Sequence, residues 1–311
     1  MKRALVVVLI VGLLLGCSGC SSSAQSTVFC MDTVMDLQLW GKDAQEAAGY
    51  MQFVLEEQEK TWSTTDPDSL IGNLNRGVDI QLDVPYQTVL VKAQQLSERT
   101  GGAFDPKLRS LSEAWGFYDE AYRVPTQEQI QEGIDAGQWD LGAALKGYAG
   151  TKCVEALERF RVDRAILNLG GNVQTYGKKP DGTPWQIGIQ NPNGGDYVGV
   201  VCVEGTMSIV TSGDYQRYFE LDGVRYHHIL DPKTGYPADS GLRSVTVICS
   251  DGMTADALST ALFVMGLEEG SAFWRQSDDF EAVFILTTGE IYATEGAALS
   301  GCDYEVISRE N

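Results

Sequence analysis

The feature that most limits the fold is a change of pattern after residue 161. Before it, one strand-like segment (34–40) is followed by amphipathic helical segments; after it come short strand-like segments separated by turns. Helices are expected at 44–62, 84–100, from 126 onward, 146–161, 253–265 and 268–276. Strands are expected at 34–40, 165–168, 185–190, 198–203, 208–211, 217–221, 224–230, 244–249, 282–287 and 290–294. Such a mixture of packed helices and antiparallel hairpins predicts an α+β fold.

Local signals support several of these boundaries. Asp83 followed by Pro85 is typical of a helix start, and Thr126 with Gln129 has the spacing of a capping box. Asp222-Gly223 between two strand-like segments predicts a two-residue hairpin turn.

The first residues have the pattern of a bacterial lipoprotein leader. Two basic residues precede an apolar run that is too short to span a membrane, and Leu14-Leu15-Gly16-Cys17 matches a lipoprotein processing site. We therefore expect a signal peptide at 1–16, a lipidated Cys17, a polar tether at 17–28 and a folded domain at 29–311. This places the protein, lipid-anchored, on the extracytoplasmic face of the bacterial cytoplasmic membrane. Cys20 as the lipidated residue, and an ordinary secretory leader, remain the alternatives.

Charge and cysteine content exclude other classes. The 311-residue chain has 23 Lys and Arg against 43 Asp and Glu, a net charge of −20, which argues against nucleic acid as a partner. A phosphate-bearing ligand would then need a metal ion or backbone amides to hold it. The cysteines beyond the leader form no Cys-x-x-Cys pair, so neither a zinc site nor a disulfide framework is indicated.

The best candidate for a reaction centre lies between residues 211 and 260. His227 and His228 are adjacent there, and Asp256 and Thr260 are four residues apart in an expected helix. Two oxygen ligands on one helix face suit a hard cation such as magnesium. An acid near a helix start is also commonly a partner of the helix dipole, and the spacing alone does not separate these interpretations.

Two turns rich in glycine could hold an anion. Gly170-Gly171 directly follows an expected strand, and Asp140 precedes a small-residue turn that leads into a helix at Lys146. Backbone N–H groups in such turns can cradle phosphate, although a plain glycine turn or a helix cap explains each of them equally well.

Taken together, the ordered motifs resemble the ApbE family. The motifs are Met31-Asp32-Thr33-Val34-Met35, Ser69-Leu70-Ile71-x-x-Leu74-Asn75, Gly102-Ala103-Phe104-Asp105-Pro106, Trp115-Gly116-Phe117, Asp140-Leu141-Gly142-Ala143-x-x-Lys146-Gly147-Tyr148, Asn168-Leu169-Gly170-Gly171-Asn172, Thr211-Ser212-Gly213-Asp214-Tyr215, His228-Ile229-Leu230-Asp231-Pro232-Lys233-Thr234-Gly235 and Ala255 to Gly266. The resemblance runs from about Phe29 to the C-terminus.

This resemblance implies a T-fold-like α+β architecture and the activity of an FAD:protein FMN transferase. Such an enzyme binds FAD and magnesium and moves FMN to a threonine hydroxyl of an exported flavoprotein, with AMP as the leaving group. The resemblance assigns the flavin nucleotide to Met31, Ala103, Phe104, Asp105, Asp140, Lys146, His228 and Ile229. It assigns the metal to the Ala143 carbonyl and to the Asp256 and Thr260 side chains, with Ser259 beside them.

The resemblance also implies catalytic roles for Asp256 and His228. His228 would either accept the proton of the attacking threonine or orient the phosphate, whereas His227 is interpreted as its strand neighbour. Two positions depart from the family pattern: Thr65 stands where many members carry tyrosine, and Asp32 where many carry glycine. The first suggests weaker flavin stacking and weaker exclusion of water, unless Trp62 closes the pocket.

Two other functions fit the same residues. One is a magnesium-dependent FAD pyrophosphatase, in which water replaces threonine and FMN and AMP are released. The other is a lipid-anchored flavin-binding protein without turnover.

Overall fold

The computed structural model describes residues 22–310. The expected signal peptide at 1–16, Cys17 and Cys20 lie outside the described residues. Within residues 22–310 no helix is both long and apolar enough to cross a membrane.

A nine-stranded, largely antiparallel sheet forms the centre of the molecule, in the order β1-β2-β3-β4-β7-β10-β11-β12-β14. Only the last pair, β12 with β14, is parallel. The strands are β1 (Ser23–Cys30), β2 (Thr33–Gly41), β3 (Val162–Leu169), β4 (Asn172–Gly177), β7 (Ser208–Gly213), β10 (Leu242–Cys249), β11 (Phe280–Leu286), β12 (Ile291–Thr294) and β14 (Glu305–Ile307).

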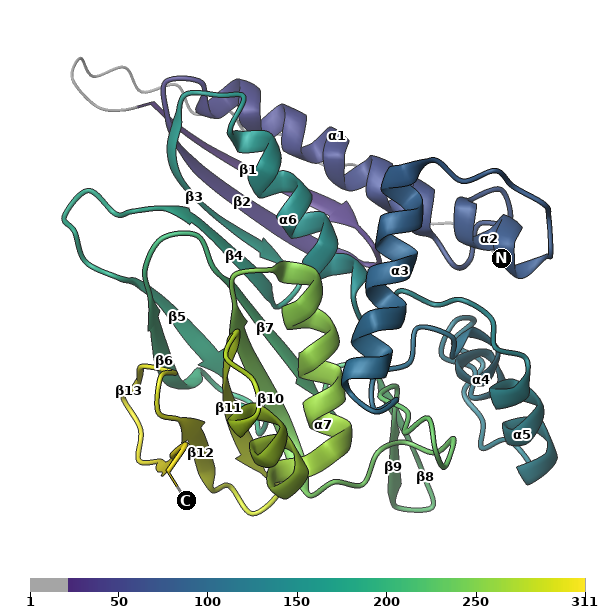
Figure 1. Ribbon diagram of the computed structural model, residues 1–311. Helices are drawn as coiled ribbons and strands as arrows, with labels where there is room; N and C mark the ends of the chain where they lie inside the picture. The colour runs from purple at the N-terminus through teal and green to yellow at the C-terminus, as the bar shows by residue number, and fades with distance from the viewer. Residues whose placement is uncertain (1–21, 311) are drawn as a thin grey trace.

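Helices cover one face of this sheet, with α1, α6 and α7 lying along the strands and α3 beside them (Figure 1). Their apolar faces follow the helical period; in α1, Ala47, Met51 and Leu55 are fully buried against β1, β2 and β3. The helices are α1 (Ala44–Trp62), α2 (Leu70–Asn75), α3 (Val84–Arg99), α4 (Arg109–Ala114), α5 (Gln127–Asp135), α6 (Leu145–Leu157) and α7 (Gly252–Arg275).

The other face is partly covered by a three-stranded sheet, β13-β6-β5. Its strands are β5 (Trp185–Gln190), β6 (Tyr197–Val203) and β13 (Leu299–Ser300). Alternate residues of β5 point inward, and Ile187 and Ile189 pack in one cluster with Ile209 of β7 and Ile248 of β10. A separate hairpin, β8 (Tyr218–Leu221) and β9 (Val224–His227), turns at Asp222-Gly223 as expected. The α+β prediction is confirmed.

The expected tether at 17–28 was wrong in its described part, because Ser23–Cys30 is strand β1, paired in register with β2. Ala24, Val28 and Cys30 face the core, whereas Gln25 and Thr27 lie on the other face of this edge strand. Its polar residues are therefore those of a strand with one wetted face. The expected break between two C-terminal helices is confirmed as a kink of α7 at Gly266, whose φ is 78°.

Candidate active site

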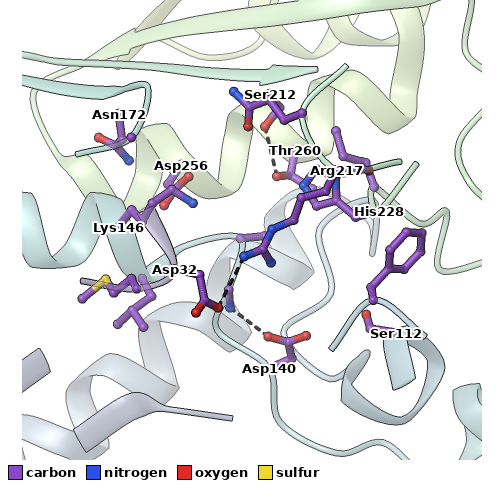
Figure 2. A pocket seen from close by; sticks show the side chains of 18 of the residues that line it. Asp32, Ser112, Asp140, Lys146, Asn172, Ser212, Arg217, His228, Asp256 and Thr260 are labelled. Atoms are coloured by element: carbon purple, nitrogen blue, oxygen red, sulfur yellow. Dashed lines mark hydrogen bonds and ion pairs between the residues drawn. The ribbon is translucent and has the colours of Figure 1, made fainter. Parts of the chain in front are cut away.

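A cavity of about 650 Å³ opens where the N-terminal part of α6, the middle of α7 and the loops at one end of the central sheet meet. Every residue that the sequence assigned to nucleotide or metal lines it. They are Met31, Ala103, Phe104, Asp105, Asp140, Ala143, Lys146, His228, Ile229, Asp256 and Thr260. Figure 2 shows that the labelled side chains come from distant parts of the chain and converge on one space.

The close crossing of α6 and α7 places Asp256 in the cavity wall. Gly147 and Gly252 face each other there, and a Cβ atom on either one would overlap the other's backbone carbonyl oxygen. Because the helices approach so closely, the Gly147 N–H donates to Asp256 Oδ2 at 2.9 Å. Asp256 is only 5% exposed, and its burial raises the pKa of the carboxyl, while the positive charge of Lys146 opposes the shift.

A second oxygen of the cavity wall comes from a residue just before the start of α6. Gly147 is the third residue of α6, and the first N–H groups of a helix have no acceptor within the helix. The Gly147 N–H donates instead to Asp256, and the carbonyl of Ala143, which precedes the N-cap residue Ala144, lies outside the hydrogen bonds of the helix. Thr260 follows Asp256 by one helical turn, and its Oγ1 lies 3.3 Å from Ser212 Oγ. A carbonyl, a carboxylate and a hydroxyl therefore line one side of the cavity.

This donor set fits magnesium better than a softer metal. All three groups offer oxygen, and residues 22–310 contain no cluster of three His, Cys, Asp or Glu side chains that could hold a metal ion. Magnesium usually takes one or two carboxylates and completes its shell with water and substrate phosphate oxygens. Ser259 is oriented beside the set, because its hydroxyl donates to the Asp256 carbonyl at 2.8 Å and contacts Ser212 Oγ at 2.8 Å.

His228 follows β9 and turns one ring nitrogen toward backbone. Its Nδ1 lies 3.2 Å from the Arg217 carbonyl oxygen, which also accepts the His228 backbone N–H at 3.0 Å. A carbonyl oxygen can only accept, so Nδ1 carries the proton and Nε2 keeps a free lone pair.

The ring of His228 is neutral at physiological pH. It is partly exposed to the cavity, yet the surrounding protein removes most of its hydration. This desolvation, with the positive charges of Arg217 and Lys146, lowers the pKa of His228 to about 3. A bound phosphate would raise that pKa again, because an anion favours the protonated ring.

His227 lies outside the cavity lining, as expected of a strand neighbour. It is buried in β9, its Nε2 lies 3.1 Å from the Ala238 carbonyl, and its ring packs edge-on against Phe263. Burial lowers the pKa of His227 to about 4.

The residues expected at the flavin nucleotide lie around the rest of the cavity. Asp140 accepts hydrogen bonds from the Gly142 N–H, at 2.9 Å, and from the Tyr118 hydroxyl. Asp105 accepts from the Lys107 N–H, and burial raises its pKa. Phe104 is 1% exposed and packs in the core, so its loop rather than its ring is suited to meet a ligand.

Both departures from the family pattern lie at the cavity. Met31 and Asp32 form the β1–β2 turn with φ values of 51° and 57°, a left-handed conformation that glycine adopts without strain. Thr65 and Tyr118 both line the cavity. The Tyr118 ring packs against the Arg109 guanidinium at 4.0 Å, and Arg109 Nε donates to the Thr64 carbonyl. Trp62 lines the cavity too, but it is 1% exposed and packs against Tyr86 and Tyr148.

Sequence reasoning gave no role to several cavity residues, among them Ser212, Arg217, Asn172 and Tyr118. Ser212 lies in the motif from Thr211 to Tyr215, and Arg217 lies two residues beyond that motif. A pattern of residues does not reveal that the register of β7 places Ser212 next to α7, or that the β8–β9 hairpin carries Arg217 over the cavity. Tyr118 follows the Trp115-Gly116-Phe117 motif and offered no signal of its own.

Comparison with known proteins identifies the family. The sequence pattern of the ApbE family matches residues 31–284, and the chain belongs to this family. An FAD:protein FMN transferase of Treponema pallidum is 32% identical over 281 residues, 78% of each chain. Another, from Haemophilus influenzae, is 30% identical over 279 residues, 80% of each. The crystal structure of an ApbE protein of Thermotoga maritima has a TM-score of 0.82 at 32% identity and covers 88% of this chain and 97% of that one.

Proposed function

We propose that this protein is an FAD:protein FMN transferase. The observation that carries the proposal is that an oxygen donor set, a neutral histidine and two cationic side chains meet in one cavity. The similar proteins of Treponema pallidum and Haemophilus influenzae bear that name and share most of their length with this chain. An acidic protein that binds a dinucleotide needs such a local concentration of positive charge and metal ligands.

In this proposal magnesium is held by the Ala143 carbonyl, Asp256 and Thr260. When bound there, the ion would neutralise charge on the substrate's pyrophosphate. Lys146 adds a positive charge beside Asp256, and Asp140 and the 103–105 loop bind the remainder of the nucleotide. The Gly147 N–H holds the carboxylate of Asp256 in place.

The reaction we propose is attack by a threonine hydroxyl of an exported flavoprotein on the phosphorus of the FMN half of FAD. The new bond joins the threonine oxygen to that phosphorus, and the P–O–P bond to AMP breaks. Nε2 of His228, with its free lone pair, accepts the hydroxyl proton, while the Arg217 carbonyl keeps the ring oriented.

One incubation tests this function. Purified protein is mixed with FAD, magnesium and a flavoprotein domain that carries the target threonine. A covalently fluorescent acceptor together with AMP supports transfer. Free FMN and AMP without labelled acceptor would instead indicate a pyrophosphatase, and bound but intact FAD a non-catalytic flavin-binding protein.

Thr65→Tyr should suppress a leak of FMN to water. With a small residue at this position the flavin is less covered, so we expect the wild type to release FMN slowly from FAD when acceptor is absent. The added ring should lower this release several-fold while acceptor labelling continues. The measurement is free FMN by chromatography. If the wild type releases none, another group closes the cavity, and Tyr118 is then the ring to replace.

We also propose that the protein is anchored by lipid at Cys17 on the extracytoplasmic face of the membrane, where exported acceptors are found. Cys17→Ala should leave an uncleaved or soluble precursor, because acylation needs the thiol. Labelling cells with a fatty-acid analogue checks this. Continued labelling of the variant would move the anchor to Cys20 or refute it.

A further inference from the structure

We infer that Arg217 is a phosphate-binding residue of this site and that Asp32 is the partner on which its side chain rests before substrate binds. The inference deepens the proposed function, because it names a residue that recognises the phosphate of the flavin nucleotide.

Arg217 is one of only two permanently positive side chains in a cavity whose other charged side chains are acidic. Among the residues that line it, five carry carboxylates, whereas Lys146 and Arg217 alone carry a permanent positive charge. The carboxylates are Asp32, Glu59, Asp105, Asp140 and Asp256. The last four each accept at least one backbone N–H, which holds them in the wall. Asp32 is instead 81% exposed and contacts the guanidinium.

The contact between Arg217 and Asp32 is weak enough to be exchanged. Arg217 Nη2 lies 3.4 Å from Asp32 Oδ2, and the Arg217 side chain is itself 48% exposed. Exposed ion pairs of this kind contribute little to stability. A guanidinium that binds phosphate through two parallel hydrogen bonds forms a stronger interaction.

The position of Arg217 suits a phosphate that is close to the reacting atoms. Its backbone carbonyl fixes His228, and its positive charge acts on the same ring. Figure 2 shows the Arg217 side chain extending between His228 and Asp32, across the space bounded on the far side by Lys146 and Asp256. A phosphate bound in this space would lie between two cations that come from opposite walls.

Asp32, which stands where many family members carry glycine, should affect phosphate binding in this arrangement. Asp32 occupies a left-handed turn position without needing its side chain for the turn, and its carboxylate competes with substrate for Arg217. Removing the carboxylate should therefore strengthen phosphate binding, whereas removing the guanidinium should weaken it. If the ion pair only held the two loops together, removing either side chain would change phosphate binding in the same direction.

The test compares dissociation constants of riboflavin, FMN and FAD, measured by flavin fluorescence with magnesium present, for wild type, Arg217→Gln, Asp32→Asn and the double variant. Arg217→Gln should weaken FMN and FAD binding on the order of tenfold to a hundredfold. The dissociation constant of riboflavin should change less than about twofold, because riboflavin has no phosphate that could bind the guanidinium. Asp32→Asn should tighten FAD binding by about two- to fivefold.

The double variant separates direct competition from a general effect of charge. If Asp32 acts by holding Arg217, Asp32→Asn should have no effect on FAD binding once Arg217 is glutamine. A gain that persists in that background, equal losses for riboflavin and FAD, or weaker binding in both single variants would each overturn the inference. Thermal melts of the four proteins show that binding is compared between folded molecules.

Binding is measured independently of turnover, so the two proposals can fail separately. Phosphate-specific weakening without acceptor labelling by the wild type would refute the transferase and leave the role of Arg217 standing. Normal acceptor labelling by the wild type, together with unchanged FAD affinity in Arg217→Gln, would support the transferase and refute the role of Arg217.

Discussion

Asp256→Asn should lose about a hundredfold to a thousandfold of magnesium-dependent turnover while the protein stays folded. The amide is nearly isosteric and can still accept the Gly147 N–H, but it lacks the charge that a divalent cation requires. A bound cation stabilises developing charge by several kcal/mol, and each 1.4 kcal/mol is a factor of about ten in rate. The measurement is FMN transfer over a range of magnesium concentrations.

Thermal unfolding gives a second readout for Asp256. If magnesium binds only the native protein, it should raise the melting temperature of the wild type, and this rise should disappear in Asp256→Asn. Without metal the variant should melt at the same temperature or higher, since burial disfavours the charged carboxylate and raises its pKa. Normal turnover at low magnesium would show that Asp256 only stabilises the helix.

Asp251→Asn is the matched control, with the same chemical change at the N-cap of the same helix but outside the cavity lining. Asp251 accepts the Thr254 N–H at 2.8 Å and pairs with Lys92 at 2.6 Å. The amide oxygen can still cap the Thr254 N–H, so only the ion pair with Lys92 and the charge at the helix N-terminus are lost, which should lower stability by about 0.5–1 kcal/mol. The response to magnesium should remain, which separates loss of a carboxylate charge on this helix from loss of a metal ligand.

The sequence predicted those parts of the fold in which local signals agree with the packing. Residues 44–62 form one helix with the expected bounds, and the capping box at Thr126 and the turn at Asp222-Gly223 are present. The edge strand β1 was missed because half of its residues face solvent and give it a polar composition. Edge strands carry a weaker sequence signal than strands that are buried on both faces.

For the site, the sequence predicted residues but not their relative positions. Asp256 and Thr260 are one helical turn apart, so spacing alone placed them on one face. The sequence did not predict a role for Arg217, because this residue meets Asp32, 185 residues away in the chain, only in the folded structure. The hydrogen bond from the Gly147 N–H to Asp256 follows from the close packing of two helices, which the order of residues does not reveal.

Gly147→Ala should therefore affect both stability and catalysis. The glycine has ordinary helical backbone angles, so alanine introduces only steric overlap: its Cβ would collide with the Gly252 carbonyl oxygen and lie 2.8 Å from the Asp256 Cβ. Backbone atoms cannot rotate away, and α6 and α7 would have to separate. We expect a loss of about 3 kcal/mol in the free energy of unfolding, measured by urea denaturation.

Gly49→Ala is the matched control, because the same substitution should increase stability at this position. Gly49 lies exposed in α1, and a Cβ there would meet nothing within 4 Å. Alanine should stabilise this helix by about 0.5–1 kcal/mol and leave transfer unchanged. In Gly147→Ala, by contrast, the molecules that remain folded should need more magnesium for half-maximal rate, because separation of the helices moves Asp256 from the Ala143 carbonyl. Wild-type stability together with an unaltered magnesium requirement would mean that the crossing at Gly147 does not position the metal ligands.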